Sequence, residues 1–405
     1  MKKTILIISG GSEAVPGIKK AKEMGLYVVV SDIDPNAIGF EFSDDKIIAS
    51  TYDFEETASL AKKYNESTRK IDGVIAIASD VPYTVAYVAN TLGLQGLSLE
   101  TAMLSSDKLK MKDKFKEMNI PIPLYWEVHT LEELKEIVKT HGFPLIIKPV
   151  DSRGARGVLL LTKQDILEWA FEHSKKQSPS SKLIVEEYID GPQVSTEAII
   201  IDGVGYPVGF SDRNYELLNT FSPYIIENGG DMPSALSERD QDEVAKTAIN
   251  AGLALGIING IVKGDMVLSK DGPKVIEVAS RLSGGWFSTD QIPLSTGVDL
   301  IKAAINQSLG IYINPKNLIP KYHKGVAIRY FFPEPGIISR INNIDLFNEK
   351  EWVYRIGFFL KSGDTISSVT NHTKRSGFVI TTGKNKAEAI KNAKNVVDGV
   401  EILTL

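Results

Sequence analysis

The sequence predicts an α/β protein that begins with a parallel, doubly wound sheet and continues as mixed α+β structure. Three observations carry this prediction. Strand and helix patterns alternate over the first hundred residues, which is typical of a parallel sheet with crossover helices. Further along, paired strand patterns joined by short turns indicate antiparallel hairpins. The final 85 residues combine short strand patterns with one helix, which indicates a small α+β module.

We expect the 405 residues to form three domains, because domains usually run to about 100–200 residues. The first is a Rossmann-like sheet domain over residues 1–100. The second covers residues 101–315 and includes a mobile lobe at about 113–187. The third is the C-terminal α+β module, residues 316–405.

Composition and charge disfavour several classes of protein. The net charge is −5 and the basic residues are scattered, so we expect no nucleic-acid partner. No apolar run approaches the roughly 18 residues that a membrane helix needs, and no cleavage site follows the apolar N-terminus. The chain has no cysteine for a disulfide or thiolate metal site, and its histidines lack metal-ligand spacing. We therefore expect a cytoplasmic protein without a membrane partner.

The first domain is expected to place polar residues at one edge of its sheet. Strand patterns over 4–10, 26–34 and 70–80 end in glycine or aspartate, and parallel sheets bind ligands beyond the carboxyl ends of their strands. The glycines in GGSEAVPG do not match G-x-G-x-x-G, so a dinucleotide site is disfavoured. Asp32 is as well suited to capping the next turn. Asp80 remains a candidate substrate residue at this edge.

Two lysines precede a glycine-rich loop. Lys108 lies in a charged helical pattern over 105–120, where a solvated surface lysine is the common interpretation. A second helix begins with the capping box of Thr130 and Glu133. Lys148 ends the strand pattern PLIIKP, directly before the loop, and a lysine there can reach an α- or β-phosphate as a point charge.

The loop VDSRGARGVLLL, residues 150–161, leaves a strand and returns to one after a short flexible and cationic stretch. Its glycines allow backbone N–H groups to face an anion, and a serine and two arginines add donors. The loop is therefore a candidate flap over phosphates, although a hairpin turn with solvated arginines explains it when taken alone. The candidate contacts are Ser152, Arg153, Gly154, Ala155, Arg156, Gly157 and Val158.

A strand pattern ending in VEEYI leads into a tight turn. Its main chain offers the neighbouring donor and acceptor that an adenine edge needs, and Gln193 follows at a distance suited to a ribose hydroxyl. An ordinary edge hairpin is an equal alternative from this stretch alone. The candidate adenine contacts are Glu186, Glu187, Tyr188 and Ile189.

The hairpin KGDMVLSKDGPKVIEVASR places two acids on adjacent strands. Pairing of its strands brings Asp265 and Glu277 together, and alternation puts Glu277, Ala279 and Arg281 on one face. Two neighbouring carboxylates repel each other unless a cation neutralises them, and oxygen ligands favour Mg²⁺, with Mn²⁺ as the alternative. Arg281 adds a fixed positive fork suited to a phosphoryl group or a carboxylate. A surface hairpin with a structural acid–arginine pair is the competing interpretation.

Taken in order, the two lysines, the glycine-containing flap, the E-E-Y-I segment and the hairpin ending in E-x-x-x-R resemble an ATP-grasp enzyme. The resemblance covers roughly residues 1–310 and points to the carboxylate–amine ligase or carbamoyl-phosphate-synthase-large-chain branch. It implies a two-lobed ATP-grasp domain over 101–315 that binds ATP and Mg²⁺. Lys108 and Lys148 would contact phosphates beneath the flap, and residues 186–189 and Gln193 would hold the nucleoside. Asp265 and Glu277 would bind the metal, and Lys148 and Arg281 would act in catalysis.

Three positions depart from the family pattern. Gln193 stands where the family usually has Glu, yet it can still bond a hydroxyl. Ala279 replaces an Asn that often completes the shell of a second metal ion. Gly154 and Ala155 lack hydroxyls that are frequent in the flap, which leaves the backbone and the arginines to contact phosphate.

The resemblance implies ADP-forming ligation of a carboxylate and an amine through an acyl phosphate. We expect small-molecule substrates and rank amino-acid-like substrates first. Dimers are common among relatives of this family, so a homodimer is also possible for this chain. The segments RLSGGWFSTDQIP, SDRNYE and ENGGDMPSA are expected to shape the acceptor site, although Arg213 is equally interpreted as a solvated charge. The substrate candidates are Asp80, Arg213, Glu227, Ser283, Gly284 and Gly285.

Three alternatives stay open at this point. A biotin-dependent carboxylase shares the resemblance, but its flap is richer in glycine and its acid-and-histidine stretch after the metal strand is absent here. A non-catalytic ATP-binding regulator is disfavoured because both acids and Arg281 are retained. An NAD-dependent oxidoreductase would rest on the first domain alone.

Overall fold

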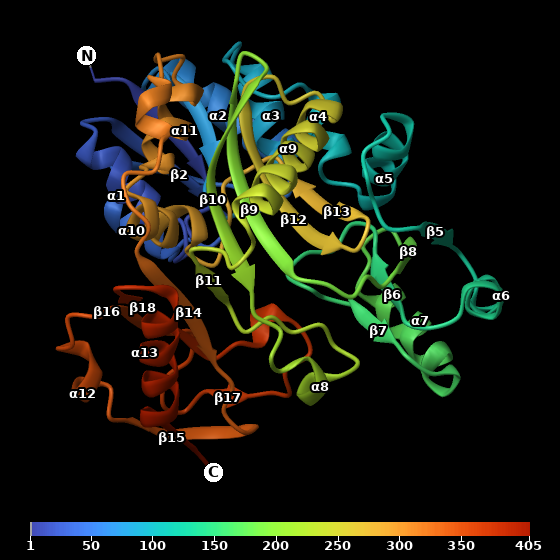
Figure 1. Ribbon diagram of the computed structural model, residues 1–405. Coiled ribbons are helices and arrows are strands. Elements are labelled where there is room, and N and C mark those ends of the chain that lie inside the picture. The colour runs from blue at the N-terminus through green and yellow to red at the C-terminus, as the bar shows by residue number, and fades with distance from the viewer. Residues whose placement is uncertain (1) are drawn as a thin grey trace.

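The computed structural model describes residues 2–405 and has the predicted α/β architecture, with an N-terminal parallel sheet, antiparallel central sheets and a small C-terminal sheet (Figure 1). The N-terminal sheet has the strand order β3-β2-β1-β4, and all its pairings are parallel. Its strands are β1 (Thr4–Ile8), β2 (Tyr27–Asp32), β3 (Asp45–Ile48) and β4 (Gly73–Ala76). Its main helices are α1 (Val15–Glu23), α2 (Phe54–Ser67) and α3 (Pro82–Thr91).

The carboxyl ends of β1 and β2 are joined by a side-chain contact. Gly10 N donates to Asp32 Oδ2 at 2.8 Å, and Asp34 N donates to Asp32 Oδ1 at 3.1 Å. Asp32 therefore fixes the two loops in place, which is the turn-capping role that the sequence also allowed.

A separate four-stranded sheet, in the order β5-β8-β6-β7, forms a lobe within the predicted range of about 113–187. It has its own apolar core, and Figure 1 shows it projecting from the rest of the molecule. The predicted capping box is present: Thr130 accepts from Glu133 N while the Glu133 carboxylate accepts from Thr130 N. The lobe comprises β5 (Tyr125–Val128), α6 (Leu131–His141), β6 (Leu145–Pro149), β7 (Leu159–Leu161), α7 (Leu167–Lys176) and β8 (Leu183–Glu187).

The largest sheet has eight strands in the order β13-β12-β9-β10-β11-β14-β18-β16. Helix α9 (Glu238–Ala254) packs on its first strands and α13 (Lys386–Gly399) packs on β14 and β18 (Figure 1). The sheet is continuous across the predicted boundary at 315/316, because β11 pairs with β14. Its strands are β9 (Gln193–Ile201), β10 (Val204–Arg213), β11 (Gly230–Met232), β12 (Gly260–Ser269), β13 (Gly272–Ala279), β14 (Gly325–Phe331), β16 (Val353–Phe358) and β18 (Gly377–Gly383).

The remaining elements connect these sheets. Helix α11 packs on the N-terminal domain, where Leu300 and Ile305 share one core with Ile5 and Ile18. A small sheet in the order β17-β15-β19 closes the C-terminal part. These elements are α4 (Leu99–Leu104), α5 (Lys108–Glu117), α8 (Leu218–Phe221), α10 (Ile292–Thr296), α11 (Leu300–Ser308), β15 (Gly336–Asn342), α12 (Asp345–Asn348), β17 (Thr365–Ile366) and β19 (Glu401–Thr404). Among residues 2–405, none of the helices is both long and apolar enough to cross a membrane.

Candidate active site

A cavity of about 870 Å³ lies where the N-terminal sheet edge, the β5–β8 lobe, the large sheet and the C-terminal segments meet. It brings together all of the predicted site residues except one. The exception is Gly157, which is buried with a φ of +72°, and a Cβ there would lie 2.9 Å from Pro149 and Gln177. The lining residues predicted from the sequence are Asp80, Lys108, Lys148, Ser152, Arg153, Gly154, Ala155, Arg156, Val158, Glu186, Glu187, Tyr188, Ile189, Gln193, Arg213, Glu227, Asp265, Glu277, Arg281, Ser283, Gly284 and Gly285.

Lys148 lies on β6 in a buried ion cluster at the wall of the cavity. Its Nζ is 2.9 Å from one oxygen of Glu186, and the Nζ of Lys112 is 3.3 Å from the other. Burial works to raise the pKa of Glu186, but the two lysine charges outweigh it and lower that pKa. The Glu186 carboxylate therefore holds both lysines in place, and Glu187, Tyr188 and Ile189 line the cavity beside it.

Lys112 does not line the cavity, but it is a buried partner of Glu186 that sequence reasoning missed. It follows Lys108 by four residues on α5, so both side chains project from the same face of the helix. Burial lowers the pKa of Lys112 to about 8, although Glu186 opposes the shift. The i, i+4 spacing was the signal that the sequence offered.

The flap is held by three different parts of the molecule. Lys108 Nζ donates to the carbonyl of Ser152 at 2.9 Å, and Arg153 pairs with Asp80 at 3.2 Å. The carbonyl of Gly154 accepts from the backbone N–H of His372 at 3.0 Å. The flap thus lies over the cavity between the N-terminal sheet edge and a C-terminal loop.

Asp80 also contacts Arg281, at 3.3 Å. Arg281 follows the β12–β13 hairpin that carries Asp265 and Glu277, called the acid hairpin below. The Asp80 carboxylate therefore bridges the flap and the end of the acid hairpin. Burial works to raise the pKa of Asp80, but Arg281 and Arg153 outweigh it, and the pKa is lowered. The ionised Asp80 carboxylate therefore connects the first domain to the two arginines at the cavity wall, Arg153 and Arg281.

The two predicted metal ligands are direct cross-strand neighbours, since Asp265 of β12 pairs in register with Glu277 of β13. The Asp265 carboxylate contacts Arg213 at 2.9 Å and also pairs with Lys263, a residue that sequence reasoning missed. Burial works to raise the pKa of Asp265, yet these two cations hold it well below its usual range. Glu277 has a cationic contact with Lys108 at 3.4 Å.

The donor set in this part of the cavity suits a hard cation. Within residues 2–405 no group of three or more histidine, cysteine and acidic side chains could hold a metal by itself. Two carboxylates supply only oxygen ligands, and Mg²⁺ commonly completes such a shell with phosphates and water. The residues therefore fit Mg²⁺ bound together with a nucleotide, and fit zinc poorly.

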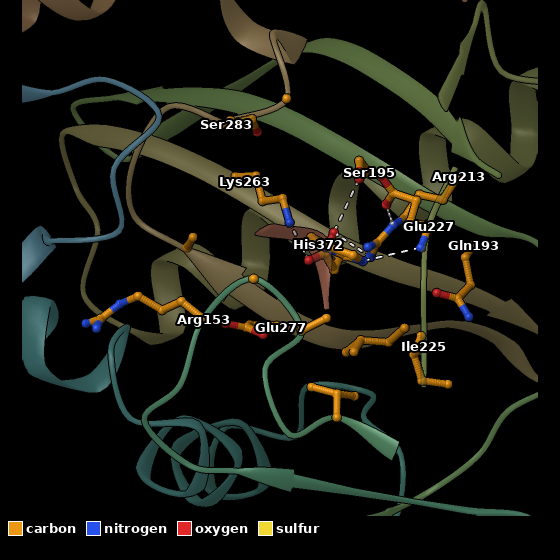
Figure 2. Close-up of a pocket in the computed structure, with 18 of the residues that line it drawn as sticks. Arg153, Gln193, Ser195, Arg213, Ile225, Glu227, Lys263, Glu277, Ser283 and His372 are labelled. Carbon is orange, nitrogen blue, oxygen red and sulfur yellow. Dashed lines mark hydrogen bonds and ion pairs between the residues drawn. The ribbon is translucent and has the colours of Figure 1, made fainter. Parts of the chain in front are cut away.

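A second charged group lies beyond the acid hairpin. Arg213 Nε is 2.6 Å from Glu227, and Arg375 lies 3.6 Å from the same carboxylate. Figure 2 shows Arg213, Glu227, Lys263 and His372 gathered around one region, with Arg153 and Gln193 at opposite sides of the view. Arg213 is thus engaged by two carboxylates instead of being a solvated loop charge.

His372 reaches this region from the C-terminal module, and no pattern in the sequence pointed to it. Its Nε2 accepts from the backbone N–H of Glu227 at 3.3 Å, and it also hydrogen-bonds to the backbone of Ile225. Burial lowers the pKa of His372 well below its usual value. The imidazole is therefore neutral and structural, since its nitrogens connect the loop at 225–227 to the module.

The loop after the acid hairpin is held by two glutamates that sequence reasoning also missed. Gly285 N donates to Glu13 at 2.6 Å, and Ser283 N donates to Glu197 at 2.9 Å. A Cβ on Gly284 would lie 2.7 Å from the Glu13 carboxylate, so the close approach needs glycine there. Glu197 also accepts from Ser288 Oγ, and it is fully buried.

Comparison with known families assigns two parts of the chain. Residues 105–285 match the ATP-grasp domain, and residues 329–404 match the L-amino acid ligase C-terminal domain 2. The crystal structure of L-amino acid ligase from Bacillus licheniformis has the same fold, with a TM-score of 0.84 and 22% identity, covering 100% of this chain and 99% of that one.

Two relatives are similar to this chain in sequence over more residues than the ATP-grasp match covers. The alanine–anticapsin ligase of Bacillus subtilis (strain 168) is 26% identical over 245 residues, which is 55% of this chain and 50% of that protein. The carbamoyl phosphate synthase large chain of Caldanaerobacter subterraneus subsp. tengcongensis is 23% identical over 307 residues, 73% of this chain and 27% of that protein. The chain thus spans half of the first relative and about a quarter of the second. Residues 105–285 of this chain are thus an ATP-grasp domain, and the chain has homologues among L-amino acid ligases and carbamoyl phosphate synthase large chains.

Proposed function

We propose that this chain is an ATP- and Mg²⁺-dependent carboxylate–amine ligase that joins amino-acid-type substrates through an amide bond. A substrate carboxylate oxygen attacks the γ-phosphorus of ATP, and the bond between that phosphorus and ADP breaks. An amine nitrogen then attacks the carbonyl carbon of the acyl phosphate, and phosphate leaves. Two lysines, a carboxylate pair and a second charged region that line one cavity are the observation that carries this proposal.

The nucleotide half of the cavity supplies positioning and positive charge. Lys108, Lys148 and Arg281 present fixed cations where phosphate oxygens would lie, and such preorganised charge stabilises phosphoryl transfer. The backbone at 187–189 and Gln193 line the part suited to adenine and ribose. The flap covers the phosphates, and because acyl phosphates hydrolyse, excluding water there protects the intermediate.

Asp265 and Glu277 would hold the metal ion, for which Mn²⁺ has similar donor preferences. Bound Mg²⁺ neutralises phosphate charge that otherwise opposes attack by a carboxylate. Lys263 and Arg213 keep Asp265 ionised, which suits a metal ligand.

The match to the L-amino acid ligase C-terminal domain supports amino-acid-type substrates over a carboxylase reaction. That region supplies His372 and Arg375 to the cavity, so it forms part of the proposed substrate site. The alanine–anticapsin ligase similarity supports the same substrate class.

A hydroxylamine trap tests the proposal. The purified chain is incubated with Mg·ATP, hydroxylamine and each of the twenty common L-amino acids, and hydroxamate and ADP are measured together. We expect at least one amino acid to give hydroxamate and ADP in equal amounts. Glu277→Gln should lower that rate by about 100-fold or more, and Glu349→Gln on the exposed surface serves as the matched control.

Two outcomes would contradict the ligase proposal. ADP release with bicarbonate and biotin, but with no amino acid, would indicate the carboxylase alternative. ATP binding without turnover under any of these conditions would indicate a regulator.

A further inference from the structure

Arg375 is a buried cation whose guanidinium is only partly satisfied. It is 10% exposed and stacks over the Tyr330 ring at 3.7 Å. Its Nη2 donates to the backbone carbonyl of Glu227, while its buried Nε has no hydrogen-bond partner among residues 2–405. A buried N–H without a partner is costly, so its presence in a cavity wall indicates a ligand that accepts from it.

The carboxylate of Glu227 does not form a close ion pair with Arg375. Glu227 is 3.6 Å from Arg375 but 2.6 Å from Arg213, so its carboxylate is engaged mainly by the latter. Arg375 is therefore free to receive a carboxylate from a substrate, through the charge-assisted hydrogen bonds that arginine favours.

Glu13 lies at the same end of the cavity. One of its oxygens accepts from Gly285 N at 2.6 Å, and the hydrogen bonds of residues 2–405 leave its second oxygen unused. Burial raises the pKa of Glu13, although the Gly285 N–H and two arginines oppose the shift. A carboxylate in this setting accepts a proton more readily than a solvated one.

The loop after the acid hairpin lies next to both Glu13 and the Tyr330–Arg375 pair. Gly285 follows Arg281 by four residues, and its N–H bonds to Glu13. The Tyr330 hydroxyl lies 3.1 Å from the position of a Cβ on Gly285, and Tyr330 carries Arg375 on its ring. Glu13 thus lies close enough to both Arg281 and Arg375 for the two charges to act on its carboxylate.

Two other buried polar side chains line the cavity, Ser283 and Gln291; Gln291 Oε1 has no hydrogen-bond partner among residues 2–405, and Ser283 Oγ lies near Glu197 without a well-formed hydrogen bond. Both residues are only 3% exposed. The Ser283 hydroxyl can donate a hydrogen bond to a polar ligand, and the Gln291 carbonyl oxygen can accept one. An amine substrate without further polar groups would leave both side chains unsatisfied.

We propose that Glu13 and Arg375 form the subsite for the amine substrate, and that this substrate is an α-amino acid with a free carboxylate. Arg375 binds the carboxylate, and Glu13 takes one proton from the ammonium so that the nitrogen lone pair can attack the acyl phosphate. As the C–N bond forms and the C–O bond to phosphate breaks, the second proton leaves with phosphate. This assignment rests on the proposed ligase function.

Acceptor preference tests the role of Arg375. Each of the twenty L-amino acids and its amide is offered as acceptor with a donor that yields hydroxamate. The wild type should prefer the free acid, and Arg375→Met should raise KM for the acid by about 50-fold while shifting the amide much less. Arg340→Met, on exposed β15 of the same module, is the matched control.

Hydroxylamine tests Glu13, because this amine is uncharged near neutral pH and needs no base. Glu13→Gln should lower kcat with an amino acid acceptor by about 100-fold and should affect hydroxamate formation far less. Glu13→Asp should retain part of the kcat with the amino acid acceptor that Glu13→Gln loses. A merely structural role would lower both rates together. Glu23→Gln on exposed α1 is the control.

The possible outcomes separate this inference from the function on which it rests. Hydroxamate formation combined with an unchanged acid-to-amide preference in Arg375→Met would overturn the subsite. The same holds if the wild type forms hydroxamate but uses none of the amino acids as acceptor. Absence of hydroxamate with every donor would overturn the ligase proposal, and this subsite with it.

Discussion

Two buried glutamates show how neighbours decide the charge of a residue. Glu186 lies between two lysines, and their charges outweigh burial and lower its pKa. Glu197 is 0% exposed and accepts hydrogen bonds from Ser283 and Ser288, but no cation contacts it directly. Burial therefore dominates and raises the pKa of Glu197 to about 7. The first glutamate is charged at neutral pH, and the second titrates there.

Glu197→Gln should remove a pH dependence of stability. Because the pKa of Glu197 is raised on folding from 4.5 to about 7, its contribution is fully present below 4.5 and is lost as pH rises through 7. Between pH 5 and pH 8 the wild type should lose roughly 2–3 kcal/mol of unfolding free energy relative to the variant. Urea denaturation at both pH values measures this difference, with Glu349→Gln as control. Parallel pH curves for wild type and Glu197→Gln would contradict it.

The flap depends on a few backbone conformations as much as on side chains. Gly154, Ala155 and Gly157 all have φ between +60° and +72°, which turns the chain sharply between β6 and β7. Gly157 also packs against Pro149, so the end of the flap is fixed to the strand that carries Lys148. The position of Lys148 is thus coupled to the conformation of the turn that follows its strand.

Gly157→Ala should cost more than the same change at another left-handed glycine. Gly25, at the end of α1, has a φ of +78° and no atom within 4 Å of an added Cβ, so alanine there meets only backbone strain, about 1 kcal/mol. At Gly157 the added methyl also lies 2.9 Å from Pro149 and Gln177, and overpacking should bring the loss to roughly 2–3 kcal/mol. Urea midpoints of the two variants give the comparison, and equal losses would show that the flap can relax.

Individual strands, helices and site segments could be predicted from the sequence, but which distant segments meet in the cavity could not. The strand before the flap, the capping box at Thr130 and the Asp265–Glu277 pairing follow from local patterns, and each is present in the structure. Strand β16 was not predicted, although Val353–Phe358 is rich in β-branched and aromatic residues. Arg375 and His372 could not be placed, because no local periodicity specifies a contact with residues about 150 positions away.

At the scale of the whole molecule, the cavity is built from segments that are distant in the chain. Glu13 comes from the first loop, Arg281 from the end of the acid hairpin and Arg375 from the C-terminal module. The division at residue 316 stays a prediction, and the continuous eight-stranded sheet indicates that the last part does not stand alone. A buried pair crosses this boundary, with Arg329 Nη1 at 2.8 Å from Asp231.

A chain ending at residue 315 should therefore fail to form the cavity. Removing β14 exposes the edge of β11 and leaves the Asp231 carboxylate without its buried arginine, which costs about 3–5 kcal/mol. We expect this fragment to aggregate in size-exclusion chromatography and to bind no ATP by calorimetry. A monomeric fragment with the ATP affinity of the full chain would show that the central domain folds independently.

The β11–β14 junction also sets a rule for engineering new specificities. Only two residue pairs define its register, Asp231 with Ala327 and Met232 with Val326. A graft of the C-terminal module from another ligase would have to carry an arginine at position 329 and preserve this alignment. In a chimaera whose β14 pairs with β11 one residue out of register, each β14 side chain would point to the opposite face of the sheet. Side chains of the grafted strand that should face the substrate would then point away from it.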